Sequence, residues 1–401
     1  MPQPDFPALP RLERVEAIHV RVPFRRPLLD ATGEFTHRRA WLLRIVDADG
    51  NEGLGEAALN PVAADVTEGS LDALIRAIVP ELAAGRTPAW ADLRSEGEPG
   101  RASMAAVDGA IEALLAAQEA HAVAANAVAA GATHPAQTIP VSAAIPFAGP
   151  DAGAEAAVQA IELGFRTLKL RAGFERSTDQ LVDRLRAIRA AIGPEPGLRV
   201  DAGGAWDLDT AAERIEAMTP FRIEYVEQPL AAWNVAGHAA LRERVRVPIA
   251  LDESVESESS AREALAEGAV DVVIVKPARV GGRAATMRIA EAALAAHASV
   301  ILGTYFETGV GIAAALRIAA ALRIAAALRI AAALPPAGAD RRPAHGLATA
   351  GLLVHDLLTV PLPIEKGAMV VPARVALEES EVERYTLERI EAGRVTGGRG
   401  A

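Results

Sequence analysis

Four charged residues each close a short apolar run, at nearly equal intervals along the chain. They are Asp201 in RVDAGGAW, Glu227 in YVEQPL, Asp252 in ALDES and Lys276 in VIVKP, separated by 26, 25 and 24 residues. A single acid at such a position is more often a helix cap or an ion-pair partner than a ligand. A series of four is different, because a buried charge costs several kcal/mol unless it is paired or bound to a metal. The series therefore favours a metal site over a structural network.

The three acids indicate which metal would bind. Carboxylates that converge on one point repel one another unless a cation lies between them. Oxygen ligands in this number favour Mg²⁺, with water and substrate oxygens completing an octahedron. Asp201, Glu227 and Asp252 are therefore the predicted magnesium ligands. Glu253, the next residue in the chain, is predicted to support the site by orienting a lysine.

The basic residues of the series indicate proton transfer. Lys169 and Arg171 in TLKLRAG lie one interval before the first acid and two residues apart, which places them on the same face of a strand. A divalent cation nearby lowers the pKa of a lysine, so that its neutral amine can act as a base. Lys276 would face this pair across the substrate. We predict that a carboxylate substrate is polarised by the metal and loses the proton on the adjacent carbon to a lysine.

The elements that must position these residues follow a regular rhythm. From residue 138 onwards, short β-branched runs such as TIPVSAAI, TLKLRAG, IEYVEQPL and DVVIVKPARV alternate with helical segments. This alternation is typical of a parallel sheet with right-handed crossovers. Seven units, with AHGLAT as a possible eighth strand, favour an α/β fold of the (β/α)₇β TIM-like barrel type, whose strand ends meet at one rim. A doubly wound sheet is the alternative, although no G-x-G-x-x-G follows a strand.

The N-terminal third has a different character. Residues 11–60 alternate as half-buried strands with a hairpin, and residues 64–129 have the apolar periodicity of helices. The predicted domains are therefore an α+β unit at 1–135, the catalytic barrel at 136–360 and a C-terminal segment at 361–401 that returns to the α+β unit.

Residues 312–334 repeat IAAALR three times and then end in IAAAL. A period of six residues distributes Ile and Leu around a helix instead of forming one stripe. We expect a long alanine-rich helix that ends before the two prolines at 335 and 336.

Composition excludes several classes of protein. The formal net charge of the 401 residues is −11, and no basic stripe is present, which argues against a nucleic-acid partner. Cysteine is absent, so thiolate metal sites and a cysteine nucleophile are excluded. No uncharged run is long enough to cross a membrane, and the first residues have no signal-peptide core. We expect a cytoplasmic protein that acts on a small-molecule carboxylate, without a membrane partner.

The combined motifs resemble those of a known family. Lys169-x-Arg171, Asp201, Glu227-Gln-Pro, Asp252-Glu-Ser and Lys276-Pro are similar to the enolase superfamily, muconate lactonizing enzyme subgroup. The resemblance implies an N-terminal α+β capping domain before the barrel, and usually a homo-oligomer. It also implies that the three acids bind Mg²⁺, that Arg171 and Lys276 flank the substrate and that Lys169 assists.

Within the subgroup, the stretches AHGLATAGLLVHDLL and GLGEAAL resemble o-succinylbenzoate synthases of menaquinone biosynthesis. Those enzymes dehydrate 2-succinyl-6-hydroxy-2,4-cyclohexadiene-1-carboxylate. By this resemblance, Gly303, Thr304 and Gly346 would bind the distal end of the substrate. The alternatives are an N-acylamino acid racemase or dipeptide epimerase, and a muconate cycloisomerase-like or vestigial enzyme that keeps the metal site. The Asp-x-Asp motif usual in dipeptide epimerases is absent from residues 345–349.

Two positions depart from the family pattern. Arg171 replaces the second lysine of the usual Lys-x-Lys, and Gly203 stands where asparagine is common. The replaced lysine supplies the base in the synthases, and arginine, with a pKa above about 12, is a poor base. Lys169 or Lys276 could take over proton abstraction, Arg171 could act from an unusual environment, or activity could be reduced.

Overall fold

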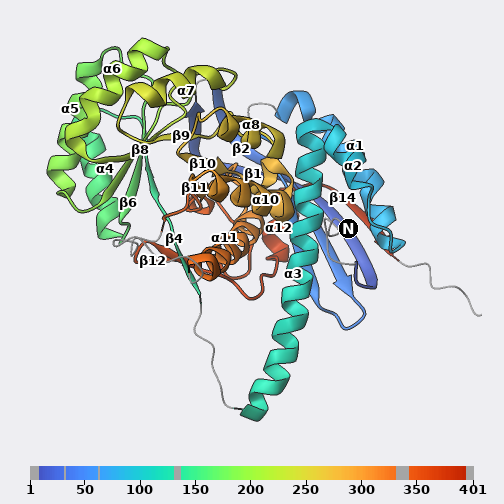
Figure 1. The fold of residues 1–401 in the computed structure, drawn as a ribbon. Helices are drawn as coiled ribbons and strands as arrows, with labels where there is room; N and C mark the ends of the chain where they lie inside the picture. The colour runs from blue at the N-terminus through green and yellow to red at the C-terminus, as the bar shows by residue number, and fades with distance from the viewer. Residues whose placement is uncertain (1–8, 31–32, 62–63, 131–136, 331–342, 394–401) are drawn as a thin grey trace, which may run out of the picture.

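The computed structural model describes residues 9–30, 33–61, 64–130, 137–330 and 343–393. An antiparallel sheet with three helices lies beside a curved parallel sheet that is surrounded by helices (Figure 1). The antiparallel sheet consists of β1 (Leu12–Asp30), β2 (Gly33–Asp47), β3 (Glu52–Ala57) and β14 (Thr386–Gly393), in the order β14–β1–β2–β3. The C-terminal strand β14 thus pairs with the first strand of the chain.

Alternation along β1 buries both faces of this sheet. Val15 and Ala17 pack in one apolar cluster with the N-terminal helices, whereas Ile18 and Val20 pack in another with residues from the C-terminal part of the chain, Leu353 among them. The helices are α1 (Ala64–Ala83), α2 (Trp90–Ser95) and α3 (Gly97–Ala130).

Helix α3 packs directly on β3 because β3 contains glycine. A Cβ atom at Gly55 would lie only 1.8 Å from the carbonyl oxygen of Ala106. The absence of a side chain therefore allows the helix to approach the strand at backbone distance.

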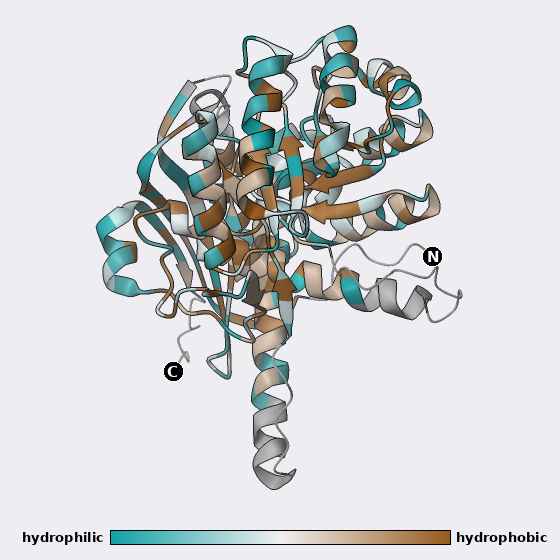
Figure 2. Cartoon of the chain, turned by 90° about the vertical axis from the view of Figure 1, so that its left-hand side faces the viewer, coloured by the Kyte–Doolittle hydropathy of each residue, from teal (hydrophilic) through white to brown (hydrophobic). Residues whose placement is uncertain are grey.

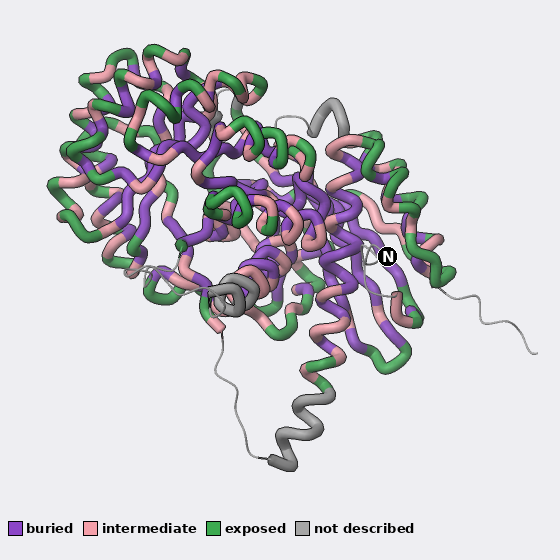
Figure 3. The backbone as a smooth tube through the Cα atoms, in the orientation of Figure 1, coloured by how far each residue is buried: buried purple, intermediate pink, exposed green. Residues whose placement is uncertain are grey.

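The parallel sheet contains seven strands in sequential order. They are β5 (Ala143–Ile145), β6 (Thr167–Arg171), β7 (Gly197–Asp201), β8 (Ile223–Glu227), β9 (Ile249–Leu251), β10 (Val272–Val275) and β11 (Ser299–Leu302). The helices that follow them are α4 (Pro150–Glu162), α5 (Thr178–Ile192), α6 (Leu208–Met218), α7 (Val235–Arg244), α8 (Glu258–Ala266), α9 (Pro277–Val280), α10 (Gly282–Ala295) and α11 (Gly309–Ile330), with a short 3₁₀ turn η1 (Thr219–Phe221) before β8. The strands are mainly buried and apolar, and the outer faces of the helices are polar (Figures 2 and 3). This is the pattern of a parallel sheet covered on both faces.

A short segment around His345 occupies the position of the eighth strand. The amide of His345 donates to the carbonyl of Pro140, and the amide of Ser142 donates to the carbonyl of His345. The segment therefore pairs with the residues that directly precede β5. The amide of Gly346 donates to the carbonyl of Leu302 at the end of β11. These bonds link both edges of the curved sheet, and AHGLAT therefore closes the barrel without forming a regular strand.

Smaller elements complete the chain. A three-stranded sheet joins β4 (Thr138–Pro140), β12 (Ile364–Glu365) and β13 (Ala368–Val370), and the C-terminal part also contains η2 (Ala350–Leu352) and α12 (Glu379–Tyr385). In the described ranges no helix is both long enough and apolar enough to span a membrane.

The repeated segment forms one continuous helix as far as it is described. In α11 the buried positions include Ile312, Ala313, Leu316 and Ile318. At about 100° per residue these positions cover more than half of the helix circumference instead of one stripe. The even distribution of apolar residues thus matches a helix that is enclosed on several sides. Residues 331–342, which include the predicted end of the helix at the two prolines, lie outside the described residues.

Candidate active site

The strand ends bring the predicted site residues to one rim of the barrel. Asp201 and Glu227 are the last residues of β7 and β8, and Asp252 and Lys276 directly follow β9 and β10. The register pairs Arg171 with Asp201 and Asp201 with Glu227. Since parallel strands in register end at the same edge, the regular spacing in the sequence becomes a cluster in space.

Lys169 joins two of the three acids. Its Nζ lies 3.0 Å from Oδ2 of Asp201 and 2.8 Å from Oε1 of Glu227. Both carboxylates therefore face one nitrogen atom, which occupies the space between them. The side chain of Glu227 is 1% exposed, whereas that of Lys169 is 28% exposed.

The third acid is held by two cations. Nζ of Lys276 lies 2.5 Å from Oδ2 of Asp252, and Nη1 of Arg279 lies 3.0 Å from Oδ1 of the same residue. Arg279 also donates to the backbone carbonyl of Asp252 and to the hydroxyl of Tyr305. The sequence-based prediction missed Arg279. Its signal was the spacing, since Lys276 caps α9 and a residue three positions later returns to the same side of the helix.

The electrostatic effects of the cluster act in opposite directions at the three acids. Burial raises the pKa of Glu227 to about 8, and the neighbouring Asp201 and Asp252 carboxylates act in the same direction. Burial also acts to raise the pKa of Asp201, but Lys169 and Arg171 outweigh it, so that the pKa of Asp201 is lowered. In the same way Lys276 and Arg279 lower the pKa of Asp252.

The neighbouring carboxylates also shift the pKa of Lys169. Burial by itself would lower the pKa of this lysine, but Asp201 and Glu227 outweigh burial and raise its pKa well above the usual range. The acids therefore keep the Lys169 ammonium charged in this arrangement.

Glu253 has an unsatisfied acceptor. Its Oε2 is buried and has no hydrogen-bond partner. Burial raises the pKa of its carboxyl to about 7, and Asp252 and Asp201 add to the shift. The predicted role of Glu253 in orienting a lysine is not accompanied by a hydrogen bond to Lys276, although Lys276 does lower the Glu253 pKa.

The donor set fits a hard divalent cation. Three carboxylates end adjacent strands, two of them face one point, and a buried Glu253 oxygen has no partner. Such oxygen donors suit Mg²⁺. Among the described residues, no three acids or histidines are already gathered tightly enough to hold a metal ion. In this structure Lys169, Lys276 and arginines supply the positive charge, so that Mg²⁺ binding would require these cations to shift. Metal binding at Asp201, Glu227 and Asp252 remains a prediction.

The predicted substrate-binding residues lie beyond β11. Gly303 contacts the stem of Lys276, since a Cβ at position 303 would lie 3.4 Å from Cγ of that lysine. The hydroxyl of Thr304 lies 2.9 Å from that of Thr349. The amide of Gly346 donates to Leu302, so it holds the barrel closed and would reach a substrate only if that bond broke. Contact of Gly303, Thr304 and Gly346 with substrate remains a prediction.

The rarity of lysine is a second signal. Of the 41 basic residues only three are lysines, at positions 169, 276 and 366, and two of these lie in the cluster. Unlike the guanidinium group of arginine, the amine of lysine can lose its proton when its pKa is lowered. The catalytic role of Lys169 and Lys276 remains a prediction.

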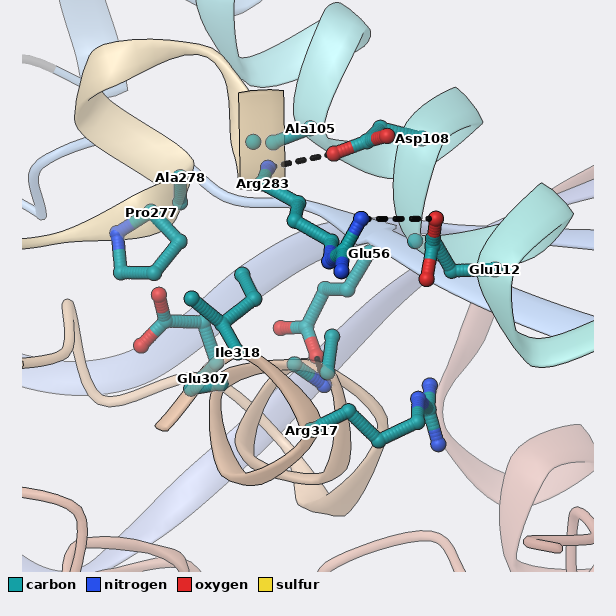
Figure 4. A pocket seen from close by; sticks show the side chains of 15 residues that line it. Glu56, Ala105, Asp108, Glu112, Pro277, Ala278, Arg283, Glu307, Arg317 and Ile318 are labelled. Atoms are coloured by element: carbon teal, nitrogen blue, oxygen red, sulfur yellow. Dashed lines mark hydrogen bonds and ion pairs between the residues drawn. The ribbon is translucent and has the colours of Figure 1, made fainter. Parts of the chain in front are cut away.

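Hydrogen bonds join the N-terminal unit to the barrel just beyond the end of β11. Glu56 at the end of β3 accepts hydrogen bonds from the amide and hydroxyl of Thr308 and from the amide of Gly311, at the N-terminus of α11. A negative charge at a helix N-terminus is favourable. Figure 4 shows Glu56 and Arg317 beside a cavity of about 30 Å³ between α3 and α11, which is large enough only for water.

A much larger cavity, of about 880 Å³, lies at the opposite end of the barrel. Its lining includes Thr167 and Ser299, the first residues of β6 and β11. Asp201, Glu227, Asp252 and Lys276 stand at the other ends of the strands and do not line this cavity, so its size does not make it the site of the chemistry.

Comparison with known proteins agrees with this architecture. Residues 152–376 match the family model described as Enolase C-terminal domain-like. The chain belongs to the enolase superfamily. The predicted resemblance is thus confirmed, and so is the TIM-like barrel with an N-terminal capping domain. The superfamily fold is seen in the muconate lactonizing enzyme of Pseudomonas fluorescens, whose structure matches with a TM-score of 0.73 and 23% identity over 94% of this chain and 100% of that one.

Relatives within the superfamily differ in their named activities. The o-succinylbenzoate synthase of Thermobifida fusca (strain YX) is 36% identical over 254 residues, which cover 63% of this chain and 72% of that protein. The N-succinylamino acid racemase of Amycolatopsis sp is 38% identical over 147 residues, only 37% of this chain and 38% of that protein. A dipeptide epimerase from Cytophaga hutchinsonii, solved with Mg and a dipeptide, matches with a TM-score of 0.74 and 21% identity over 95% of this chain and 99% of that one.

Proposed function

We propose that this enolase-superfamily chain is a magnesium-dependent lyase, an o-succinylbenzoate synthase that removes water from 2-succinyl-6-hydroxy-2,4-cyclohexadiene-1-carboxylate in menaquinone biosynthesis. The observation that carries the proposal is the cluster of three carboxylates and two lysines at the ends of adjacent barrel strands. The likeness to the Thermobifida fusca synthase over nearly two thirds of the chain supports the choice of reaction.

The roles of the side chains follow from their positions. Asp201, Glu227 and Asp252 would hold Mg²⁺, which when bound supplies positive charge that stabilises the charge developing on the substrate carboxylate. Lys169 and Lys276 are the two amines at the rim, and one of them takes the proton from the carbon next to that carboxylate. In the structure each amine pairs with carboxylate oxygens that are assigned to Mg²⁺. Metal binding would therefore release both amines from these oxygens while leaving them beside the substrate.

Arg171 favours elimination over racemisation. Racemisation needs a proton acceptor on each face of the α-carbon. Arg171 remains charged at all ordinary pH values and accepts no proton. Removal of a proton and of a hydroxyl group from the same face requires one base, which can return the proton to the leaving group. The loss of the second lysine is therefore better tolerated in a dehydration.

The second candidate is an N-succinylamino acid racemase, because the related Amycolatopsis enzyme has that activity in its name and is 38% identical in the aligned region. Both reactions begin with removal of an α-proton. The discriminating experiment incubates the purified chain with Mg²⁺ and each substrate, following o-succinylbenzoate formation by absorbance and N-succinylamino acid racemisation by polarimetry. Racemisation faster than dehydration would overturn the lyase proposal.

Other features of the protein remain predictions. These are the domain boundaries at 135/136 and 360/361, the homo-oligomeric state and the cytoplasmic location. Light scattering coupled to size-exclusion chromatography would give the oligomeric state directly.

A further inference from the structure

The carboxylate of Asp201 is held on one side by two donors. Nη1 of Arg171 lies 2.9 Å from Oδ1 of Asp201, and the amide of Gly203 donates to the same oxygen at 3.1 Å. The other oxygen, Oδ2, faces Lys169. Arg171 and Gly203 therefore hold one oxygen of this carboxylate. The second oxygen faces Lys169, which also pairs with Glu227.

Gly203 also leaves room for the side chain of Arg171, because it has no side chain of its own. Its φ angle is +56°, in the left-handed region that favours glycine. A Cβ atom at position 203 would lie 2.4 Å from Nη2 of Arg171, 2.7 Å from Nη1 and 2.8 Å from Cζ. The guanidinium group therefore fills the space that a side chain at position 203 would take. A side chain at position 203 would displace the guanidinium group from its present position beside Asp201.

We propose that Arg171 is a positioning residue for Asp201 and that Gly203 is its necessary partner, so that the two departures from the family pattern are one coupled change. The proposal rests on the proposed function in one respect, the assignment of Asp201 as a magnesium ligand. A carboxylate ligand whose second oxygen is held by hydrogen bonds is oriented before the metal binds, and losing such a contact typically weakens metal binding about 10- to 100-fold.

The direction of the effect separates positioning from simple charge. Arg171 is a cation near a site for a divalent cation. If it acted only through its charge, its removal would relieve repulsion and tighten Mg²⁺ binding. If it positions Asp201, its removal weakens binding. The sign of the change in the Mg²⁺ dissociation constant therefore decides between the two roles.

The experiment is isothermal titration calorimetry of the full chain with MgCl₂. The variants are Arg171→Ala, Gly203→Ala and the double substitution, and the Mg²⁺-induced shift in melting temperature is a second readout. We expect each single substitution to weaken Mg²⁺ binding about 10- to 100-fold. The double substitution should weaken it no further than either single one, because both remove the same contact. Arg171→Lys, which keeps a cation and a donor, should recover part of the loss.

Gly204 provides the matched control. It too has a left-handed backbone, with φ of +76°, but a Cβ there would first meet the carbonyl oxygen of Leu230 at 3.3 Å and would not meet Arg171. Gly204→Ala therefore reproduces the backbone strain alone. It should lower the melting temperature while leaving the Mg²⁺ dissociation constant unchanged.

Three outcomes would each overturn one claim: the positioning role of Arg171, its coupling to Gly203, or the magnesium site itself. Mg²⁺ binding that is unchanged or tighter in Arg171→Ala would exclude positioning, and that test needs no substitution at Gly203 should Gly203→Ala fail to fold. Effects of Arg171→Ala and Gly203→Ala that multiply in the double variant would show that the two residues act separately. A wild-type chain that binds no Mg²⁺ would instead overturn the proposed function itself.

Discussion

Replacing Lys169 by methionine removes a cation shared by two of the site's carboxylates while keeping the length and apolar stem of the side chain. Nζ of Lys169 lies 2.8 Å from Glu227 and 3.0 Å from Asp201, and the Glu227 side chain is almost fully buried. Removing one partner of a buried ion pair typically costs about 3–5 kcal/mol, because the other charge is left unpaired. Lys169 is 28% exposed, so the lower end, about 3 kcal/mol, is appropriate.

This loss should be visible in the melting temperature, and Mg²⁺ should reverse it. About 3 kcal/mol corresponds to a decrease of about 4 °C in a chain of this size. In saturating Mg²⁺ the difference from the wild type should shrink, because the bound ion supplies the positive charge that Lys169 provided. Differential scanning calorimetry with EDTA and with Mg²⁺ measures both effects.

Lys366→Met is the matched control, since Lys366 is the third lysine of the chain and is exposed. It should melt at the wild-type temperature under both conditions. If Lys169→Met were as stable as the wild type in EDTA, the ion pairs would not hold the site together. If Mg²⁺ failed to narrow the difference, Asp201 and Glu227 would not be metal ligands.

Three further predictions concern catalysis and pH. Lys169→Ala and Lys276→Ala should each lower turnover of the cyclohexadiene substrate at least about 100-fold, the usual scale for a general base; a variant within a few-fold of the wild type is not the base. Arg171→Lys should retain or raise that turnover, because it restores the family's base; abolished turnover would mean that Arg171 has an essential role of its own. Burial raises the pKa of Asp108 to about 7, so its contribution to stability is complete below pH 4 and is lost as pH rises through about 7, by at most about 1.4 kcal/mol per pH unit. Asp108→Asn should flatten the dependence of melting temperature on pH in this window, and an unchanged profile would exclude Asp108 as its source.

The sequence predicted which residues meet at the ends of the barrel strands. The intervals between Asp201, Glu227, Asp252 and Lys276 correspond to one strand and one helix each, and this regularity predicts convergence without knowledge of side-chain packing. The capping unit was predictable for a similar reason, since strand alternation and helical periodicity are local patterns.

Contacts between distant residues could not be predicted in this way. Arg279 turns back onto Asp252 from a helix of one turn, and Glu56 caps a helix that begins more than 250 residues later. The sequence showed Arg171 and Gly203 as two separate departures, whereas their coupling depends on where one side chain meets another backbone. Such contacts depend on tertiary packing, which has no periodicity in the sequence.

The most direct test of the central claim measures removal of the α-proton itself. The purified chain is incubated in D₂O with 2-succinyl-6-hydroxy-2,4-cyclohexadiene-1-carboxylate, and separately with N-succinylamino acids, each in Mg²⁺ and in EDTA. NMR spectroscopy then follows product formation and deuterium incorporation. We predict o-succinylbenzoate formation with Mg²⁺, none in EDTA, and none with Mg²⁺ when Asp201 is replaced by asparagine. Absence of both product and α-deuterium with every substrate in Mg²⁺, or equal turnover in EDTA, would contradict a magnesium-dependent proton-abstracting site at the ends of these strands.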